Sequence, residues 1–251
     1  MFKIEIPIPP LAEQKRIAGL LDATDALRVK RRETLTQLDT LLQSVFLDMF
    51  GDPDTNPMEW AKRRIESVFH VARGGSPRPI RDYLTESEDG LRWIMIGDAI
   101  EGSRYITSTS KRIKPEGLRK SRMVHKGDLL LTNSMSFGKP YILKTEGCIH
   151  DGWLVLSPKD KRMSTDFFYN LLSTATLYRE FKRKAAGAVV KNLNTTLVKQ
   201  VAVPVPPLDL QRQFAAVVES VEQQKTRQQT HLAGLNTLLA SLQSRAFSGN
   251  L

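Results

Sequence analysis

The two ends of this chain of 251 residues repeat one another when they are aligned with a shift of 197 positions. The run IPIPPL at Ile6–Leu11 returns as VPVPPL at Val203–Leu208. A glutamine follows each run at the same offset, as Gln14 in one copy and Gln211 in the other. Further identities continue along the chain to Phe50 in the first copy. A repeat of this kind predicts two copies of one structural unit, so the fold must contain two equivalent elements.

Each copy predicts a short extended segment that is stopped by a double proline and followed by a long helix. A proline pushes the preceding residue into an extended conformation and cannot itself sit inside a helix. Behind the prolines, apolar residues recur at spacings of three and four, which is typical of the seam of paired helices. We therefore predict helices over residues 11–50 and 208–247, each about 60 Å long at roughly 1.5 Å per residue. The seam residues are Ile17, Leu21, Leu35, Leu38, Leu42, Val45 and Met49 in the first copy, and Phe214, Val218, Val221, Leu232, Leu235, Leu239 and Leu242 in the second.

Polar residues interrupt the seam near the middle of both predicted helices, at Arg28 and Arg31 in the first and at Lys225 and Gln228 in the second. Such residues weaken the pairing of two helices but fix its register. The chain leaves the first helix into a middle region and enters the second helix from it, so short connections predict an antiparallel pair. We expect the middle region at one end of this rod and both termini toward the other.

A turn-rich hinge over residues 51–59 separates the first helix from a domain that we place at 60–206, with the second long helix at 207–251. Residues 1–10 are expected to be an extended tail of the kind that closes such a domain. Short apolar runs predict strands, and apolar spacing predicts a helix over residues 166–184. The predicted strands are Leu91–Ile96, Asp128–Thr132, Tyr141–Leu143 and Trp153–Leu156. The fold class is therefore α+β: one mixed domain and a long antiparallel two-helix coiled coil.

Positive charge is concentrated in the middle domain. Residues 60–200 hold 26 Lys and Arg against 14 Asp and Glu, a net charge of +12, whereas the rest of the chain is at −2. This asymmetry favours an anionic partner, with nucleic acid ahead of a membrane surface. Cys148 is the single cysteine, which excludes an intramolecular disulfide and fits a reducing cytoplasm. No apolar run approaches the roughly 20 residues of a membrane span, so we expect a soluble, cytoplasmic protein.

The order of motifs along the chain resembles the specificity subunits of type I restriction-modification systems. The repeated run of two prolines, leucine and glutamine at the head of a long helix is the first element of this resemblance. The middle region resembles the target-recognition domain of the same family. The motifs that carry this second resemblance are Gly74–Pro77, Trp93–Ile94, Lys126–Thr132, Ser136–Gly138 and Val190–Leu193.

The resemblance implies a subunit that chooses the DNA site while separate subunits methylate adenine and cleave. S-adenosylmethionine is then expected on the partner methylation subunit, and no cofactor is expected in this chain. A full-length member of the family alternates two recognition domains with two helices, whereas this sequence has one recognition domain and resembles the second half. The chain is then either a natural half-subunit or a truncated product, and we expect two copies to associate head to tail and to read a symmetric split site.

Three stretches of the middle domain combine cations for phosphate with side chains able to pair with base edges. The first is a glycine-rich loop with arginines, in which small residues let the backbone approach phosphate. The second is a basic run around a turn, and the third is a loop of amide and hydroxyl groups. A fourth stretch fits a turn that closes the domain and a DNA contact equally well. The predicted DNA-binding residues are Gly74, Gly75, Ser76, Arg78, Arg81, Lys111, Arg112, Lys114, Arg119, Lys120, Arg122, Asn133, Ser134, Ser136, Lys139, Lys191 and Asn192.

The long helices are predicted to contact the methylation subunit, the restriction subunit or a second copy through repeat-matched residues. These are Gln14, Leu35, Leu38, Leu42, Gln211, Leu232, Leu235 and Leu239. No catalytic set is predicted: Asn56-Pro57-Met58 lacks the second proline and the aromatic ring of an amino-methyltransferase loop, and there is no phosphate-binding loop. The four histidines show no ligand spacing beyond Cys148-Ile149-His150, so no metal site is predicted.

A second class of protein fits the same charge and helix pattern. It is a free-standing coiled-coil adaptor whose basic domain binds nucleic acid without sequence choice and needs no enzyme partner. Competition between DNA sequences separates the two classes, because only the specificity subunit discriminates between them.

Overall fold

The computed structural model describes residues 9–100, 102–133, 137–186 and 192–248 of the chain. It divides into two compact units. Unit 1 comprises Met1–Val45 and Ala216–Leu251, and unit 2 comprises Phe46–Ala215. None of the helices in the described ranges combines the length and the apolar character that crossing a membrane requires.

Two long helices form unit 1, and one end of each continues into unit 2. Helix α1 spans Leu11–Phe50 and helix α6 spans Leu208–Phe247. Each begins directly after a double proline. The repeated glutamine caps each start in the same way: Gln14 Nε2 donates to the carbonyl of Pro9 at 2.7 Å, and Gln211 Nε2 donates to the carbonyl of Pro206 at 2.9 Å. The sequence repeat is therefore also a repeat of local structure.

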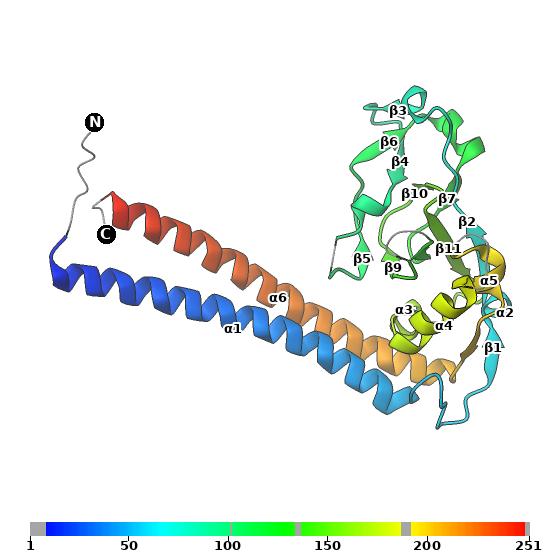
Figure 1. The fold of residues 1–251 in the computed structure, drawn as a ribbon, viewed down its shortest axis with the longest axis horizontal. Coiled ribbons are helices and arrows are strands. Elements are labelled where there is room, and N and C mark those ends of the chain that lie inside the picture. The colour runs from blue at the N-terminus through cyan, green and yellow to red at the C-terminus, as the bar shows by residue number, and fades with distance from the viewer. Residues whose placement is uncertain (1–8, 101, 134–136, 187–191, 249–251) are drawn as a thin grey trace. The chain divides into compact units, whose positions relative to one another are not determined.

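The two helices lie side by side in unit 1 and run antiparallel (Figure 1). Their polar seam positions face one another, because Arg31 Nη1 donates to Gln228 Oε1 at 2.9 Å. These two residues occupy equivalent positions in the two repeats. The predicted antiparallel coiled coil is confirmed, and the residues that interrupt its apolar seam are the ones that pair across it.

The other polar contacts of the helix pair obey the same symmetry. Arg28 Nε donates to Asn236 Oδ1 at 2.7 Å, and Lys225 Nζ donates to Asp39 Oδ1 at 2.8 Å. The repeat shift converts Arg28 into Lys225 and Asp39 into Asn236, so each contact is the image of the other. An approximate two-fold axis therefore passes through the helix pair near the Arg31–Gln228 bond, as in an isologous interface.

Unit 2 contains the strands. Its described residues form two five-stranded sheets, with strand orders β3-β6-β4-β10-β7 and β2-β11-β8-β9-β5, and a two-stranded sheet of β1 and β12. Most pairs are antiparallel, but β10 pairs with β4 and β5 pairs with β9 in parallel. The strands are β1 Lys62–Arg64, β2 Phe69–Arg73, β3 Leu84–Thr85, β4 Leu91–Ile94, β5 Tyr105–Ile106, β6 Lys111–Ile113, β7 Arg122–Val124, β8 Leu129–Thr132, β9 Pro140–Leu143, β10 Gly147–Ile149, β11 Trp153–Pro158 and β12 Ala202–Pro204.

The repeated proline segment closes unit 2. Its second copy supplies β12, which pairs antiparallel with β1 so that Arg63 lies opposite Val203. The extended segment that the sequence predicts before the second double proline is therefore present. Residues 1–8, which hold the first copy of this segment, lie outside the described residues.

Helices cover the remainder of unit 2. They are α2 (Ile65–Val68), α3 (Thr165–Leu172), α4 (Ala175–Ala186) and α5 (Thr195–Lys199). The prediction of a single helix over residues 166–184 is wrong in one respect, because Ser173 and Thr174 interrupt the helix between α3 and α4. The hydroxyl of Ser173 donates to the carbonyl of Tyr169, and the Thr174 hydroxyl donates to the carbonyl of Leu171. Serine and threonine compete with the helix backbone in this way.

Apolar clusters form the core of unit 2, and two of them support the sheets and the start of α6. One lies between the five-stranded sheets and includes Trp153, Leu130 and Ile94, each fully buried. The other is aromatic: Phe214, in the first turns of α6, packs with its ring centroid 5.5 Å from those of both Phe46 and Phe50. The loops between these strands are therefore carried on a packed double-sheet scaffold.

Candidate nucleic-acid interface

The glycine-rich loop follows β2 and is held against the turn between β10 and β11. The Gly74 amide donates to the Trp153 carbonyl at 3.0 Å, and the Gly75 amide donates to the Ile149 carbonyl at 3.1 Å. A Cβ on Gly74 would lie 2.1 Å from the His150 carbonyl oxygen, and one on Gly75 would lie 2.5 Å from that of Lys120. The absence of a side chain therefore serves protein packing, and the prediction that these glycines bring backbone to phosphate stays a prediction.

Arg78 and Arg81 extend from the same loop with their side chains 73% and 86% exposed. Arg78 Nη2 lies 3.7 Å from Asp151 Oδ2, and Arg81 Nε lies 3.6 Å from Asp82 Oδ1. Ser76 is half-buried, and its hydroxyl donates to Asp151 Oδ1 at 2.5 Å. The two arginines are thus available to a ligand, whereas Ser76 is bound within the protein.

The basic run 111–122 folds as strand β6, the 3₁₀ helix η3 (Pro115–Lys120) and the start of β7. Its side chains divide into two groups. Those of Lys111 and Arg119 are exposed and have no hydrogen bond or ion pair among the described residues. The others bind nearby oxygens, and Arg112 is half-buried where it donates to the carbonyls of Glu88 and Gly90 at 2.9 and 2.8 Å. Lys114 donates to the Asp82 carbonyl, Lys120 to the Tyr83 hydroxyl and Arg122 to the Arg73 carbonyl.

The third predicted loop begins at Asn133, directly after β8. Asn133 is only 2% exposed, and its Nδ2 donates to the carbonyl of Asp151 at 2.7 Å. Its amide is therefore used inside the protein, and base contact by Asn133 stays a prediction that would require this bond to open. Lys139, at the other end of the loop, is exposed. Ser134 and Ser136 lie outside the described residues.

The fourth stretch lies beside the third. The Leu193 amide donates to the carbonyl of Asn133 at 3.0 Å, and the neighbouring Asn192 is exposed. Asn194 caps α5 by accepting a hydrogen bond from the amide of Leu197. The described part of this segment therefore packs beside the third loop, and the DNA contact by Asn192 stays a prediction. Lys191 lies outside the described residues.

One turn, His150–Gly152, joins these stretches, and it was not among the residues predicted from the sequence. It connects β10 of one five-stranded sheet to β11 of the other. The first loop contacts it through Ser76 and the third through Asn133. The basic run reaches its edge, because the Ser121 hydroxyl donates to the Ile149 carbonyl at 3.0 Å. The one sequence signal was the Asp-Gly pair of a tight turn between two apolar runs.

The turn holds two titratable groups with shifted pKa values. Burial lowers the pKa of His150 below its usual 6.5, and the nearby carboxylates of Asp151 and Asp98 oppose this shift. Both ring nitrogens of His150 face backbone N–H groups, those of Ile96 and Gly152. The hydrogen bond from Ser76 lowers the pKa of Asp151, so this residue is a carboxylate at neutral pH. A neutral ring and a negative carboxylate thus lie side by side at the centre of the basic loops.

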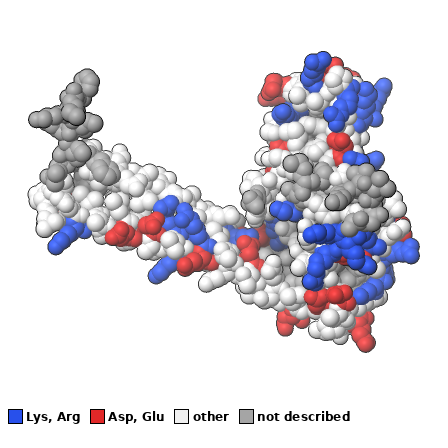
Figure 2. Space-filling model, viewed as in Figure 1, with Lys and Arg blue, Asp and Glu red and all other residues white. Residues whose placement is uncertain are grey.

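Lys and Arg side chains gather on the face of unit 2 that Figure 2 presents, including the part that carries β3 and β6. A surface of this charge attracts the phosphates of nucleic acid. It supports the predicted position of the interface without choosing between base-reading and phosphate-binding roles.

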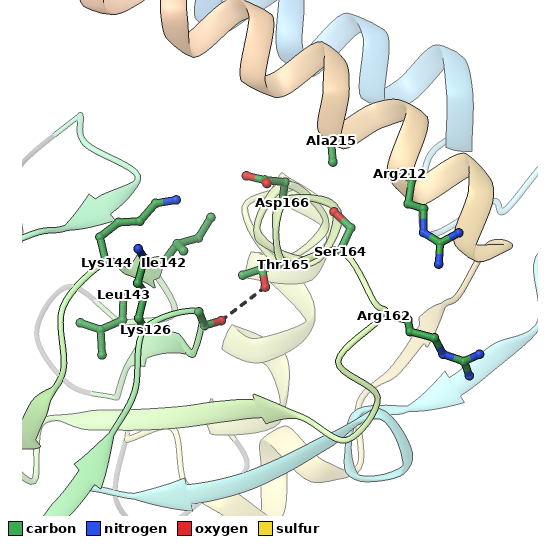
Figure 3. A pocket seen from close by; sticks show the side chains of 11 residues that line it. Lys126, Ile142, Leu143, Lys144, Arg162, Ser164, Thr165, Asp166, Arg212 and Ala215 are labelled. Atoms are coloured by element: carbon green, nitrogen blue, oxygen red, sulfur yellow. Dashed lines mark hydrogen bonds between the residues drawn. The ribbon is translucent and has the colours of Figure 1, made fainter.

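A separate cavity of about 340 Å³ opens between β9, the start of α3 and the start of α6 (Figure 3). It is lined by several cations, but three of its charged groups are already paired. Asp166 binds Arg104, Arg162 binds Asp160 and Arg212 binds Asp209. None of the residues predicted to bind DNA lines this cavity.

The residues predicted to bind partner subunits have different environments. Leu38 and Leu42 are 8% and 5% exposed, so the chain itself buries them and they are not an open partner surface. Gln211 is fully buried and accepts a hydrogen bond from the Ser164 amide at 3.1 Å. Leu35, Leu232, Leu235 and Leu239 are half-buried, and Gln14 is exposed. Seam packing and the anchoring of α6 use Leu38, Leu42 and Gln211 within the chain, and partner contact by the predicted residues stays a prediction.

Within the described residues, no three His, Cys, Asp or Glu side chains converge as metal ligands. Cys148 is buried, and burial raises the pKa of its thiol.

In the hinge, the Asp52 carboxylate accepts a hydrogen bond from the backbone amide of Asp54 at 2.7 Å and so shapes a turn.

The family model for the type I restriction modification DNA specificity domain matches residues 57–236 of this chain. The chain therefore belongs to this family. Its curated relatives include the type I restriction enzyme EcoBI specificity subunit of Escherichia coli, which is 25% identical in an alignment that covers 98% of this chain and 58% of that protein. The MjaIX specificity subunit of Methanocaldococcus jannaschii is 26% identical over 64% of this chain and 38% of that protein. The chain thus spans three-fifths or less of these relatives.

Solved structures share the fold. The HsdS subunit from Thermoanaerobacter tengcongensis matches with a TM-score of 0.59 and 22% identity, covering 98% of this chain and 61% of that one. The type I restriction-modification S subunit from M. genitalium matches with a TM-score of 0.62 and 16% identity, covering 94% and 61%. The α+β fold with its long helices is therefore the fold of this family, as the sequence motifs predict.

Proposed function

We propose that this chain is a DNA specificity subunit that directs a type I adenine-methylating and restriction complex to its target site. The observation that carries the proposal is that the turn His150–Gly152, together with Ile149 directly before it, contacts all three basic or polar loops of the family's specificity domain. Loops held together on a rigid sheet scaffold form a single surface, as reading one short DNA sequence requires. A free-standing adaptor would need no such common anchor.

The exposed residues of this surface fall into two roles. Lys111 and Arg119, which have no partner in the described part of the chain, are suited to phosphate contacts. Arg78 is exposed and lies next to Asp151, and its planar fork of donors matches the O6 and N7 acceptors of guanine in the major groove. The first group supplies affinity and Arg78 supplies sequence choice.

The chemistry belongs to partner subunits in this proposal. The chain supplies no catalytic residues of its own, and S-adenosylmethionine binds to the methylation subunit that this chain recruits. The names of the EcoBI and MjaIX relatives describe specificity subunits of restriction enzymes, which supports a division of labour of this kind. The restriction subunit is the second partner.

A second copy of the chain is the proposed occupant of the start of α1. In unit 2 the start of α6 is buried, with Gln211 bound to Ser164 and Phe214 inside the aromatic cluster. At the equivalent positions of α1, Gln14 is exposed and Ile17 is half-buried. The same local structure is therefore present twice, and the two-fold axis of the helix pair relates the two ends. Unit 2 of another copy would dock on the start of α1 as it does on the start of α6.

Binding to DNA tests the main proposal. The purified chain is incubated with duplexes whose central bases are random, and the bound fraction is sequenced over several rounds. We expect a short motif to be enriched, with the enrichment retained at physiological salt. An adaptor without sequence choice would enrich no motif, and that outcome would overturn the proposal.

The mass of the chain in solution tests the association. Light scattering at several concentrations should show a dimer, and replacing Ile17 with Asp should shift it to monomer, because a charge would be buried at the docking face. Leu27→Asp is the control and should leave the dimer intact. Leu27 also lies on α1, but it is 46% exposed and lies further along the helix from its start. A monomer at every concentration would contradict the association and leave DNA reading untouched.

A further inference from the structure

Asp151 occupies the point where the predicted base-reading arginine and two loops meet. We propose that it is a positioning residue for sequence choice, because it orients the Arg78 guanidinium and fixes the Arg78 loop against the loop that begins at Asn133. This inference rests on the proposed function. It adds a residue that touches no base and nevertheless determines how well the bases are distinguished.

The carboxylate of Asp151 contacts two residues of the first loop. Oδ1 accepts the hydroxyl hydrogen of Ser76 at 2.5 Å, and Oδ2 lies 3.7 Å from Nη2 of Arg78. The Arg78 side chain is 73% exposed, so without a partner it would sample many rotamers and lose that freedom on binding DNA. A nearby carboxylate restricts it beforehand, which improves the discrimination that a fixed donor fork provides.

The backbone of Asp151 contacts a different set of groups. Its carbonyl accepts from Asn133 Nδ2 at 2.7 Å and from Arg73 Nε at 3.0 Å. Asn133 is 2% exposed, and its own carbonyl accepts from the amide of Leu193. The backbone of one residue therefore fixes the third loop while its side chain orients Arg78, so a change of the carboxylate alone separates the two roles.

The charge of Asp151 has a second consequence. Its side chain is 42% exposed within a basic surface, so it repels phosphates that approach Arg78. A guanine edge carries no net charge and is repelled less. Arg78 would then exchange its carboxylate partner for a base more readily than for a phosphate, and removal of the charge should relax sequence choice without weakening binding to DNA in general.

Asp151→Asn tests this directly, because the amide keeps the shape and an acceptor for Ser76 while removing the charge. The motif duplex selected by the wild-type chain and a scrambled duplex of the same composition are the two probes. We expect the ratio of their Kd values to fall about fivefold or more, in the range that one base contact contributes. The Kd for the scrambled duplex should stay constant or become tighter. Asp160→Asn is the matched control, because Asp160 also pairs with an exposed arginine but lies outside the three loops.

A double-mutant cycle with Arg78→Ala shows whether Asp151 acts through Arg78. We expect Arg78→Ala and the double variant to have the same ratio of Kd values, since contacts in one network are not additive. Ser76→Ala releases the Asp151 carboxylate without removing its charge, so it should lower the ratio of Kd values partially. This variant serves as the second test if Asp151→Asn does not fold.

An unchanged ratio in Asp151→Asn would overturn the proposal. So would additive effects in the cycle, or an equal weakening on both duplexes together with a lower Tm, which would mark a purely structural residue. Failure of the wild-type chain to select any motif is a different result, since it removes the proposed function itself.

Discussion

The backbone N–H of Ser164 donates a hydrogen bond to Oε1 of Gln211 at 3.1 Å. This bond ties the start of α3 to the start of α6, and the Gln211 side chain is fully buried where it forms. The same side chain donates to the Pro206 carbonyl, so one glutamine satisfies two backbone groups. Its repeat partner Gln14 is exposed, and among the described residues its side chain makes only the equivalent bond, to Pro9.

Replacing Gln211 with Ala should therefore lower the free energy of unfolding by about 1–3 kcal/mol, because buried backbone groups are left unsatisfied. Gln14→Ala is the control at the equivalent position and should cost less than about 0.5 kcal/mol, as expected for an exposed residue. Urea denaturation at a low protein concentration measures both variants. Equal destabilisation would contradict the distinction between a buried anchor and an exposed one.

Gly74→Ala should disrupt the interface loops. A Cβ at this position would lie 2.1 Å from the backbone oxygen of His150. A backbone atom cannot move aside as the end of a flexible side chain can. Gly97 is the matched control, because a Cβ added there would meet nothing within 4 Å in the described part of the chain. We expect Gly74→Ala to lower the Tm and weaken DNA binding, and Gly97→Ala to leave both unchanged. Comparable behaviour of the two variants would show that the close approach is not required.

The helices and several strands were predictable because their signals are local. The double prolines and the apolar spacing mark where α1 and α6 begin. Compact apolar runs mark β4, β8, β9 and β11 within a few residues. The break between α3 and α4 was not predictable, since Ser173 and Thr174 are tolerated in many helices and their hydroxyl bonds become visible only in the structure.

The arrangement of the interface was not predictable either. Strand pairing in unit 2 joins segments far apart in the chain, such as β2 with β11, and no local pattern encodes it. The sequence indicated which loops are basic or polar, but the role of Asp151 depends on β10 and β11, which place the turn between them. The burial of Asn133 has the same origin, because an amide that reads a base and one that joins two loops look alike in a sequence.

The polar pair at the centre of the helix seam provides another test. Replacing both Arg31 and Gln228 with Leu should raise the Tm, because each buries apolar area worth about 1.5–3 kcal/mol in place of a partly desolvated polar contact. The same change should relax the register, which these residues fix. Thermal unfolding and disulfide trapping between cysteines introduced at successive seam positions measure the two effects. A lower Tm with a single trapped register would contradict this account.

Stability should fall in mild acid because of His150. Burial lowers the pKa of this group below 6.5, so the folded state binds the proton less well than the unfolded state does. Its contribution to stability is therefore present above pH 6.5 and is lost as the pH falls. Asp151 and Asp160 have pKa values lowered below 3.8 and titrate outside this window. Denaturation midpoints from about pH 7.5 to about pH 5.5, the range in which histidine titrates, should fall for the wild type and be flatter for His150→Gln.

Salt dependence should separate the two kinds of DNA contact. Lys111→Ala and Arg119→Ala should weaken binding to all duplexes alike and reduce the salt slope by about 0.9 for each phosphate that is no longer neutralised. Arg78→Ala should instead lower the preference for the selected motif by about 1–3 kcal/mol. If Arg78→Ala weakened binding to the motif and to a one-base variant equally, base reading would lie on another loop.

The central claim is that this chain decides where a partner enzyme methylates DNA. The direct measurement is to co-express the chain with a type I methylation subunit and to map methylated adenines across the DNA of the host cell. We expect methylation at one sequence motif, matching the motif that the purified chain selects, and loss of that pattern when Arg78 is replaced by Ala. Methylation at the same positions without the chain, or at no defined motif with it, would contradict the account.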